Sequence, residues 1–191
     1  MNKFKDYISK GRFRLRGIHV GNYIPRRCGI ATYTKDLTNA INILNPDYLC
    51  EIMAINDERE PVEYPWEVKF QIRKDNEKDY VNAAEYINRS ACDYVNLQHE
   101  YGIFGGGAYG ESILTLVRNL KKPLVTTFHT TLENPNSEQK YIIQKIAKYS
   151  RACVVMINEA MKRLADIYEI SEDKIVVIPH GVPNVPFSPS N

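Results

Sequence analysis

The chain has 191 residues, of which 43% are hydrophobic, and its 25 Lys and Arg against 23 Asp and Glu give a formal net charge of +2. This length and composition fit one folded domain with a substantial core and exclude wholesale disorder. The near-zero charge gives no reason to expect nucleic-acid binding. We expect neither a membrane span, which needs an apolar run of ~20 residues, nor a secretory signal, which needs an apolar stretch near the start.

Residues 1–15 form a basic arm, in which six Lys and Arg within the first 16 residues stand against one Asp. Aromatic and aliphatic side chains lie between these bases. The arm either makes a weak contact with an anionic membrane surface or is a solvated extension. We favour the solvated extension, because the apolar residues keep no helical period. We therefore expect a cytoplasmic protein, with peripheral membrane contact as the alternative.

The four cysteines, Cys28, Cys50, Cys92 and Cys153, are far apart and form no C-x-x-C pair. This spacing argues against a structural zinc site. Most of them lie in or beside apolar strand-like segments, so we expect free thiols in a reducing compartment.

Seven short apolar segments alternate with helical patterns along the rest of the chain. The expected strands are Gly17–Gly21, Glu51–Ile55, Val68–Ile72, Tyr94–Gln98, Leu124–Phe128, Ala152–Met156 and Ile175–Ile178. Continuous Val- and Ile-rich strands joined through helices are typical of a parallel sheet covered on both faces. We predict one α/β domain over residues 16–179, a Rossmann-like doubly wound parallel sheet of about seven strands. The first and fourth strands should be adjacent at the switch point.

The helical patterns also predict buried faces and caps. After the first strand we expect a helix whose apolar face is turned toward the core. That face consists of Ile30, Tyr33, Leu37, Ile41 and Leu44. Later helices should bury Tyr80, Ala83, Ala84, Ile87, Ile113, Leu114, Leu116, Val117, Leu120, Ile142, Ile146, Tyr149, Met161, Leu164 and Tyr168. Asn136 and Gln139 have capping-box spacing, and Asn158 is a candidate helix cap.

Three histidines, His99, His129 and His180, follow the fourth, fifth and seventh expected strands. Because ligands bind beyond the carboxyl ends of parallel strands, these residues predict a polar ligand cleft at one edge of the sheet. A lone histidine is more often structural, but three at equivalent strand ends favour the cleft. We expect the His129 imidazole to be solvated there and to contribute little to stability.

The loop after the first strand lacks both the G-x-G-x-x-G dinucleotide fingerprint and the G-x-x-x-x-G-K-[ST] phosphate loop. It still leads through Cys28 and Gly29 into a helix, whose free backbone N–H groups favour an anion. Arg26 and Arg27 add positive charge. The residues alone leave two interpretations open, an anion site and a plain turn with surface arginines.

Four segments together resemble the N-terminal half of glycosyltransferases of family four. They are PRRCGIATYTKDL after the first strand, LQHEYGIFGG after the fourth, VTTFHTT around the fifth and KIVVIPHGV at the end of the described pattern. They occur in the family's order and span most of residues 16–183. The resemblance implies a retaining enzyme of GT-B fold, with two Rossmann-like domains and a cleft between them.

This resemblance also implies a division of labour. The N-terminal domain mainly binds the acceptor, and the C-terminal domain holds the nucleotide-sugar. Residues 180–191 match the start of the interdomain linker, so the chain corresponds to one half of a GT-B fold and should transfer no sugar alone. The expected partners are a nucleotide-sugar co-substrate and a glycan, lipid or small-molecule acceptor, with no cofactor and no metal.

Several residues match family positions. Gly29 matches a glycine whose loop approaches the donor phosphates, with Cys28 where many relatives have a second glycine; Arg26 and Arg27 belong to the same loop. His180 matches a residue that shapes the domain junction. His99, Tyr101 and Gly102 match the loop that lines the acceptor side.

The two catalytic candidates are His129 and Glu100. His129 matches a histidine on the sugar and leaving-group side. Glu100 could act as a general base, although a carboxylate that accepts hydrogen bonds from loop amides is the interpretation we favour. Gly105–Gly107 could be a mobile acceptor loop, with Tyr101, Phe104 and Tyr109 as sugar-stacking rings, or slack in a long turn.

Two other classes of function remain open from the sequence. One is a non-catalytic Rossmann-like module that binds a nucleotide or a glycan. The other is a different two-domain enzyme on the same scaffold, such as an epimerase.

Overall fold

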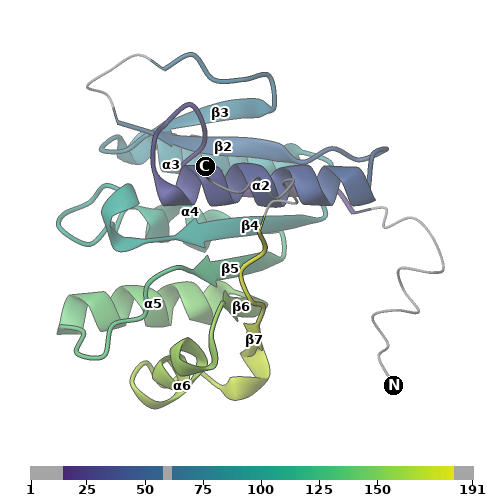
Figure 1. Ribbon diagram of the computed structural model, residues 1–191. Helices are drawn as coiled ribbons and strands as arrows, with labels where there is room; N and C mark the ends of the chain where they lie inside the picture. Colours follow the sequence, from purple (N-terminus) through teal and green to yellow (C-terminus); the bar gives the residue numbers. More distant parts are fainter. Residues whose placement is uncertain (1–14, 58–61, 183–191) are drawn as a thin grey trace, which may run out of the picture.

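The computed structural model describes residues 15–57 and 62–182, so all of the basic arm except Leu15 and most of the linker segment lie outside the described residues. Seven strands form one parallel sheet in the order β3-β2-β1-β4-β5-β6-β7 (Figure 1). Their bounds are β1 Gly17–Gly21, β2 Glu51–Asn56, β3 Val68–Arg73, β4 Tyr94–His99, β5 Leu124–Phe128, β6 Ala152–Val155 and β7 Ile175–Val177. The predicted Rossmann-like sheet is confirmed, with β1 beside β4 at the switch point.

The connections between strands are helical. They are α2 Gly29–Leu44, α3 Glu77–Arg89, α4 Ile113–Asn119, α5 Ser137–Tyr149, α6 Asn158–Asp166 and the 3₁₀ turns η1 Tyr101–Ile103 and η2 Glu172–Lys174. Helix α4 packs between α3 and α5, whereas α2 packs against β1 and α6 against β6 and β7. No helix among the described residues is long and apolar enough to cross a bilayer.

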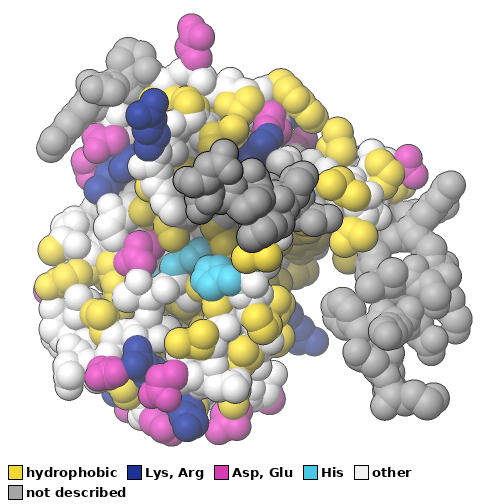
Figure 2. Space-filling view, in the orientation of Figure 1, with side chains coloured by type: hydrophobic (Ala, Val, Ile, Leu, Met, Phe, Trp, Pro, Cys, Tyr) yellow, Lys and Arg dark blue, Asp and Glu magenta, His cyan; other side chains and the backbone are white. Residues whose placement is uncertain are grey.

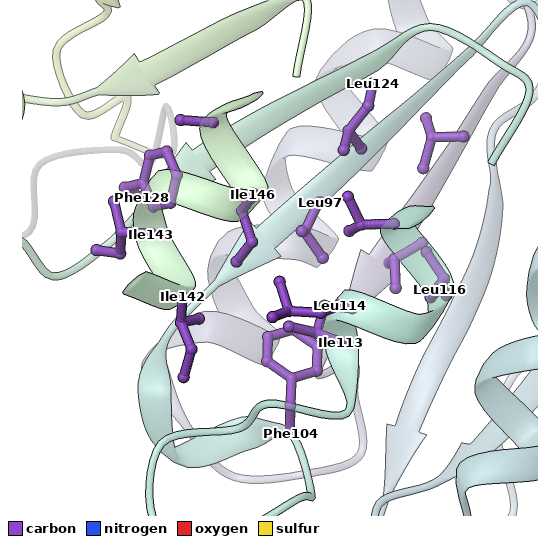
Figure 3. Packing of buried hydrophobic residues seen from close by; sticks show 14 of the residues in the cluster. Leu97, Phe104, Ile113, Leu114, Leu116, Leu124, Phe128, Ile142, Ile143 and Ile146 are labelled. Carbon is purple, nitrogen blue, oxygen red and sulfur yellow. The ribbon is translucent and has the colours of Figure 1, made fainter. Parts of the chain in front are cut away.

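The main core lies between the sheet and α3, α4 and α5. Figure 3 shows Phe104, Ile113, Leu114 and Ile142 gathered beside Leu97 of β4. The expected inward residues of α3, namely Tyr80, Ala83, Ala84 and Ile87, are all fully buried, as are Leu164 and Tyr168 near the end of the chain. Helices α3, α4 and α5 therefore bury one apolar face each against the apolar strands, and this packing produces the layered structure.

Helix α2 buries a different face from the expected one. Its buried side chains are Ala31, Thr34 and Thr38, whereas Leu44 is 62% exposed. The Thr34 hydroxyl donates to the Ile30 carbonyl at 2.7 Å, and the Thr38 hydroxyl donates to the Thr34 carbonyl at 2.6 Å. Because these bonds satisfy the hydroxyls, a small polar face can face the core. The predicted burial of Tyr149 is likewise wrong, because its side chain is 44% exposed.

Of the two predicted helix caps, one is confirmed and one is wrong. The capping box of α5 is confirmed: Asn136 Oδ1 accepts from the Gln139 amide, and Gln139 Oε1 accepts from the Asn136 amide, both at 2.9 Å. The Asn158 cap is wrong, because α6 begins one residue earlier than that cap requires. Its N-cap is Ile157, which has no capping side chain.

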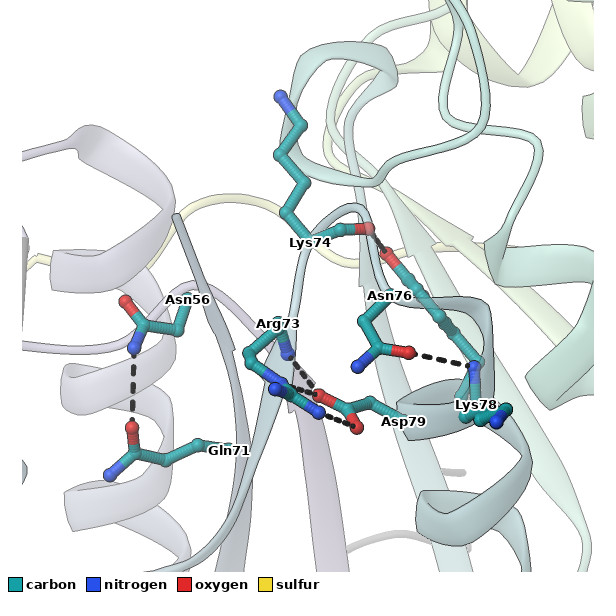
Figure 4. Close-up of polar contacts among 8 residues, drawn as sticks. Asn56, Gln71, Arg73, Lys74, Asn76, Lys78 and Asp79 are labelled. Carbon is teal, nitrogen blue, oxygen red and sulfur yellow. Dashed lines mark hydrogen bonds and ion pairs between the residues drawn. The ribbon is translucent and has the colours of Figure 1, made fainter. Parts of the chain in front are cut away.

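An ion pair joins the edge strand β3 to α3 (Figure 4). The Asp79 carboxylate accepts from Arg73 Nε at 2.7 Å and from Nη2 and the backbone amide at 3.0 Å each. The hydrogen bond from the Arg73 side chain holds the pKa of Asp79 below its ordinary value. Nearby, Tyr80 donates its hydroxyl to the Lys74 carbonyl at 2.8 Å. The turn from β3 to α3 is thereby fixed from two sides.

Candidate functional site

The carboxyl edge of the sheet brings together aromatic side chains from two connections between strands and from the segment after β7. Tyr33 of α2 lies edge-on to the His129 ring, with centroids 4.8 Å apart, and edge-on to the His180 ring at 5.7 Å. Two of the four histidines of the chain, His19 and His99, are fully buried. The other two, His129 and His180, lie beside Tyr33. Histidine side chains accordingly form the cyan patch near the centre of the face in Figure 2. The predicted convergence of His129 and His180 therefore occurs.

His129 is half-buried rather than solvated, which corrects the expectation from the sequence. Its Nε2 lies 2.9 Å from Oε1 of Gln98, and its backbone amide donates to the His99 carbonyl at 3.0 Å. Burial, with a smaller contribution from the charge of His180, lowers the pKa of His129 to about 4. The ring is therefore neutral at pH 7, and its lone pair is available as an acceptor.

Both carboxylate oxygens of Glu100 are engaged by the protein. Oε1 accepts from the Tyr101 amide at 2.9 Å and so caps η1, while Oε2 accepts from the Thr130 hydroxyl. This matches the structural interpretation of Glu100, in which the carboxylate ties the loop after β4 to the loop after β5. Its direct role in proton transfer stays a prediction.

His99 and Tyr101, predicted to line the acceptor side, are placed in the core. The His99 ring is fully buried among Tyr101, Phe104 and Phe128, with centroid distances of 5.3, 6.0 and 5.4 Å. Neither ring nitrogen has a hydrogen-bond partner, and burial lowers the pKa of His99 to about 3. The Tyr101 hydroxyl lies 3.3 Å from that of Tyr168. Of the three predicted acceptor residues, only Gly102 is exposed.

The predicted phosphate loop begins α2. Cys28 is the N-cap, and its Sγ accepts from the Ala31 amide and from Asn22 Nδ2, both at 3.4 Å. A Cβ built on Gly29 would meet nothing within 4 Å, so the first turn is open to a ligand. Arg26 is half-exposed and Arg27 is exposed. The Ala31 amide is thus taken by Cys28, whereas the Gly29 and Ile30 amides have no partner among the described residues and lie beside positive charge, as an anion site requires.

Asn22 was missed by the sequence reasoning. It follows β1, is 1% exposed, and its Oδ1 has no hydrogen-bond partner. The only signal was its place just beyond a buried strand, where parallel sheets position functional side chains.

Gly105 and Gly106 have close neighbours, whereas Gly107 is exposed and a Cβ built on it would meet nothing within 4 Å. A Cβ on Gly105 would lie 2.0 Å from the Lys74 carbonyl oxygen, and one on Gly106 would lie 2.6 Å from the Ser112 amide. Phe104, expected as a stacking ring, is 1% exposed and belongs to the core. Tyr109 is half-buried, and its hydroxyl accepts from Asn136 Nδ2 at 2.8 Å.

An open cleft of about 620 Å³ lies beside His129 and extends over the ends of β5 and β6. Arg163 of α6 supports one wall, donating to the Thr131 carbonyl at 3.2 Å and to the Glu133 carboxylate. The cleft is lined by Phe128, His129, Thr130, Thr131, Leu132, Glu133, Asn134, Met156, Ile157, Ala160, Arg163 and His180. Apart from His129 and His180, none of these was a predicted site residue, because their only signal was position after a strand.

Solved structures confirm this architecture. A glycosyltransferase from Rickettsia africae has a TM-score of 0.58 at 22% identity, over 89% of this chain and 44% of that one. The lipopolysaccharide outer core galactosyltransferase WaaB has a TM-score of 0.62 at 14% identity, over 88% and 46%. The UDP-GlcNAc 2-epimerase of Methanocaldococcus jannaschii has a TM-score of 0.55 at 15% identity, over 84% and 44%. The chain thus spans less than half the length of these structures.

The doubly wound sheet with a cleft along its carboxyl edge is a Rossmann-like domain of the kind found in GT-B glycosyltransferases. A search of curated proteins found no match. The model of Glycosyltransferase Family 4 matches residues 54–184, which is more than half of the chain. The chain belongs to glycosyltransferase family 4.

Proposed function

We propose that this chain forms the acceptor-side wall of a retaining glycosyltransferase active site, in which a sugar passes from a nucleotide-sugar to a glycan, lipid or small-molecule acceptor. The observation that carries the proposal is the placing of Tyr33, His129 and His180 beside the open start of α2, in a chain of glycosyltransferase family 4. The donor-binding wall belongs to a second domain.

The start of α2 would stabilise the departing diphosphate. Sugar transfer breaks the bond between the anomeric carbon and the phosphate oxygen, so negative charge develops on the diphosphate. The first two N–H groups of α2, those of Gly29 and Ile30, and the helix dipole can stabilise that charge without a metal. Arg26 and Arg27 lie on the same loop and add positive charge.

His129 would contact the sugar through its neutral ring. A neutral imidazole can orient a hydroxyl by accepting its hydrogen, whereas an imidazolium could only donate. In the retaining reaction the acceptor oxygen attacks the anomeric carbon from the face that the diphosphate leaves. The hydroxyl proton then passes to the departing phosphate oxygen, which accounts for the proton without a protein base.

The test uses the longest native polypeptide that contains this chain, a panel of nucleotide-sugars and acceptors, and EDTA in the buffer. We expect release of nucleoside diphosphate that requires an acceptor, and a product whose anomeric configuration, measured by NMR, is that of the donor. Arg26→Gln should raise the KM for the donor. Arg89→Gln, which alters an exposed guanidinium on α3, is the matched control and should leave KM unchanged.

Two results would overturn the proposal. Isomerisation of the nucleotide-sugar without transfer would indicate an epimerase, a chemistry that the similar fold in Methanocaldococcus makes relevant. Binding of a nucleotide or glycan without any turnover across the panel would indicate a non-catalytic module.

A further inference from the structure

Two buried amides lead from the middle of β4 to His129. Asn96 and Gln98 are 8% and 0% exposed, and side chains two residues apart lie on the same face of a strand. Gln98 Nε2 donates to Asn96 Oδ1 at 3.1 Å. This bond commits the NH₂ group of Gln98 to Asn96 and leaves its Oε1 for the neighbouring strand β5.

The Gln98 oxygen decides where the His129 proton lies. A carbonyl oxygen can only accept, and Oε1 is 2.9 Å from His129 Nε2. Nε2 must therefore carry the hydrogen. In a neutral ring the other nitrogen, Nδ1, is then an acceptor, and no described residue donates to it.

The position of the Gln98 side chain depends on a glycine in the neighbouring strand. A Cβ built on Gly21 would lie 2.9 Å from Gln98 Cβ, closer than real contacts allow. Gly21 ends β1 at the switch point, so the absence of a side chain there provides the room in which the amide lies. Any larger residue would displace Gln98 from His129.

The groups that surround the His129 ring do not favour a second proton. Facing it are Gln98 and His99 from β4, Tyr33 from α2, and His180 after β7. His99 is fully buried, and the charge of His180 opposes that of an imidazolium. With no second proton, Nδ1 keeps its lone pair.

We propose that Gln98, oriented by Asn96, is a positioning residue that fixes His129 as the Nε2-protonated tautomer, so that Nδ1 accepts a hydrogen bond from a sugar hydroxyl. The sugar contact rests on the proposed function, whereas the tautomer does not.

The first test is ¹⁵N NMR of the 191-residue chain at pH 7, with the His129 signals assigned by their loss in His129→Asn. We expect one species with hydrogen on Nε2 and an unprotonated Nδ1. Gln98→Met should remove the acceptor and speed exchange of the Nε2 hydrogen with solvent by about tenfold or more. Gln98→Glu should raise the pH at which the ring titrates, because a carboxylate favours the imidazolium. Gln71→Glu, at an exposed position on β3, is the matched control and should leave that pH unchanged.

Hydrogen on Nδ1 in the unmodified chain would overturn the proposal, and this measurement requires no variant other than the one used for assignment. Unchanged exchange in folded Gln98→Met would overturn it as well. In the longer polypeptide, Gln98→Met should lower kcat about tenfold with little change in KM. If the NMR results hold but kcat does not change, the tautomer stands and the sugar contact fails.

Discussion

Burial sets the charge of three histidines. Desolvation lowers the pKa of His19 to about 4 and that of His99 to about 3. Desolvation, together with the nearby charge of His180, lowers the pKa of His129 to about 4. An unfolded histidine titrates near 6.5, so below that pH the unfolded chain binds more protons than the folded one. Stability is therefore lost as the pH falls below about 6.5.

This linkage predicts a steep acid dependence. Between about pH 6.5 and 4, each of the three histidines should lower the free energy of unfolding by about 1.4 kcal/mol per pH unit. The urea midpoint of the chain, followed by circular dichroism, should thus be clearly lower at pH 5 than at pH 7. A midpoint that is flat over this range would show that the histidines are not held neutral.

Replacing His99 with an apolar ring should remove part of that dependence. Because its nitrogens have no partner and its neighbours are aromatic, His99→Phe removes a desolvated polar group. We expect the pH slope of stability between pH 7 and 5 to decrease by one proton, with the variant more stable than the original at pH 5. An unchanged slope would contradict the buried, neutral state of this ring.

His129→Ala should affect both stability and catalysis. The substitution leaves buried Gln98 Oε1 without its donor, at a cost of about 1–3 kcal/mol in the free energy of unfolding. In the longer polypeptide the loss of the sugar contact should reduce turnover about 10²-fold. The measurements are chemical denaturation and initial rates. A stability loss with intact turnover would make His129 purely structural.

At the scale of elements, Gly105 and Gly106 determine how the loop between β4 and α4 begins. Gly106 has φ of +84°, a conformation that favours glycine, and Gly105 lies against the backbone of the turn after β3. The start of this loop is therefore fixed against the turn between β3 and α3.

Gly105→Ala should destabilise the chain by at least about 2 kcal/mol. Its Cβ would overlap the Lys74 carbonyl oxygen, so the β3–α3 turn would have to shift. Gly102→Ala, where a Cβ meets nothing within 4 Å, is the control and should change stability by less than about 0.5 kcal/mol. Thermal or urea denaturation compares the two. Equal stabilities would mean that the turn yields easily.

The elements that the sequence predicted well are those with a strong local pattern. Strands β1 and β5 have the expected bounds, and the α5 capping box depends only on residues three apart. The face of α2 was wrong because threonine hydroxyls, which look polar in sequence, are satisfied within the helix. Burial of His99 was equally invisible, because it depends on rings brought from η1 and β5.

At the scale of the whole molecule, the order of the strands places the loops after β1, β4 and β5 at one edge, and this much of the site followed from the sequence. His129, His180 and the start of α2 were predicted there. The cleft over β5 and β6 was not, since Arg163 and Met156 carry no motif and meet only through packing.

We expect the 191-residue chain alone to transfer no sugar above a no-enzyme control. It supplies one wall of the proposed site, and holding both reactants in place can contribute about 7–11 kcal/mol of barrier reduction. The measurement compares nucleoside diphosphate release by this chain and by the longest native polypeptide at equal concentrations. Similar rates from the two would show that one wall suffices.

The parallel pairing of β1 with β4 has a consequence for synthesis. Gly17 pairs with Tyr94, so β1 has a partner on only one side until β4 has been made. At about 5–20 residues per second, Tyr94 leaves the ribosome several seconds after Gly17. During that interval an apolar strand that ends up buried on both faces lacks its second neighbour. The central strand of the sheet can therefore complete its pairing only after about half of the chain has been synthesised.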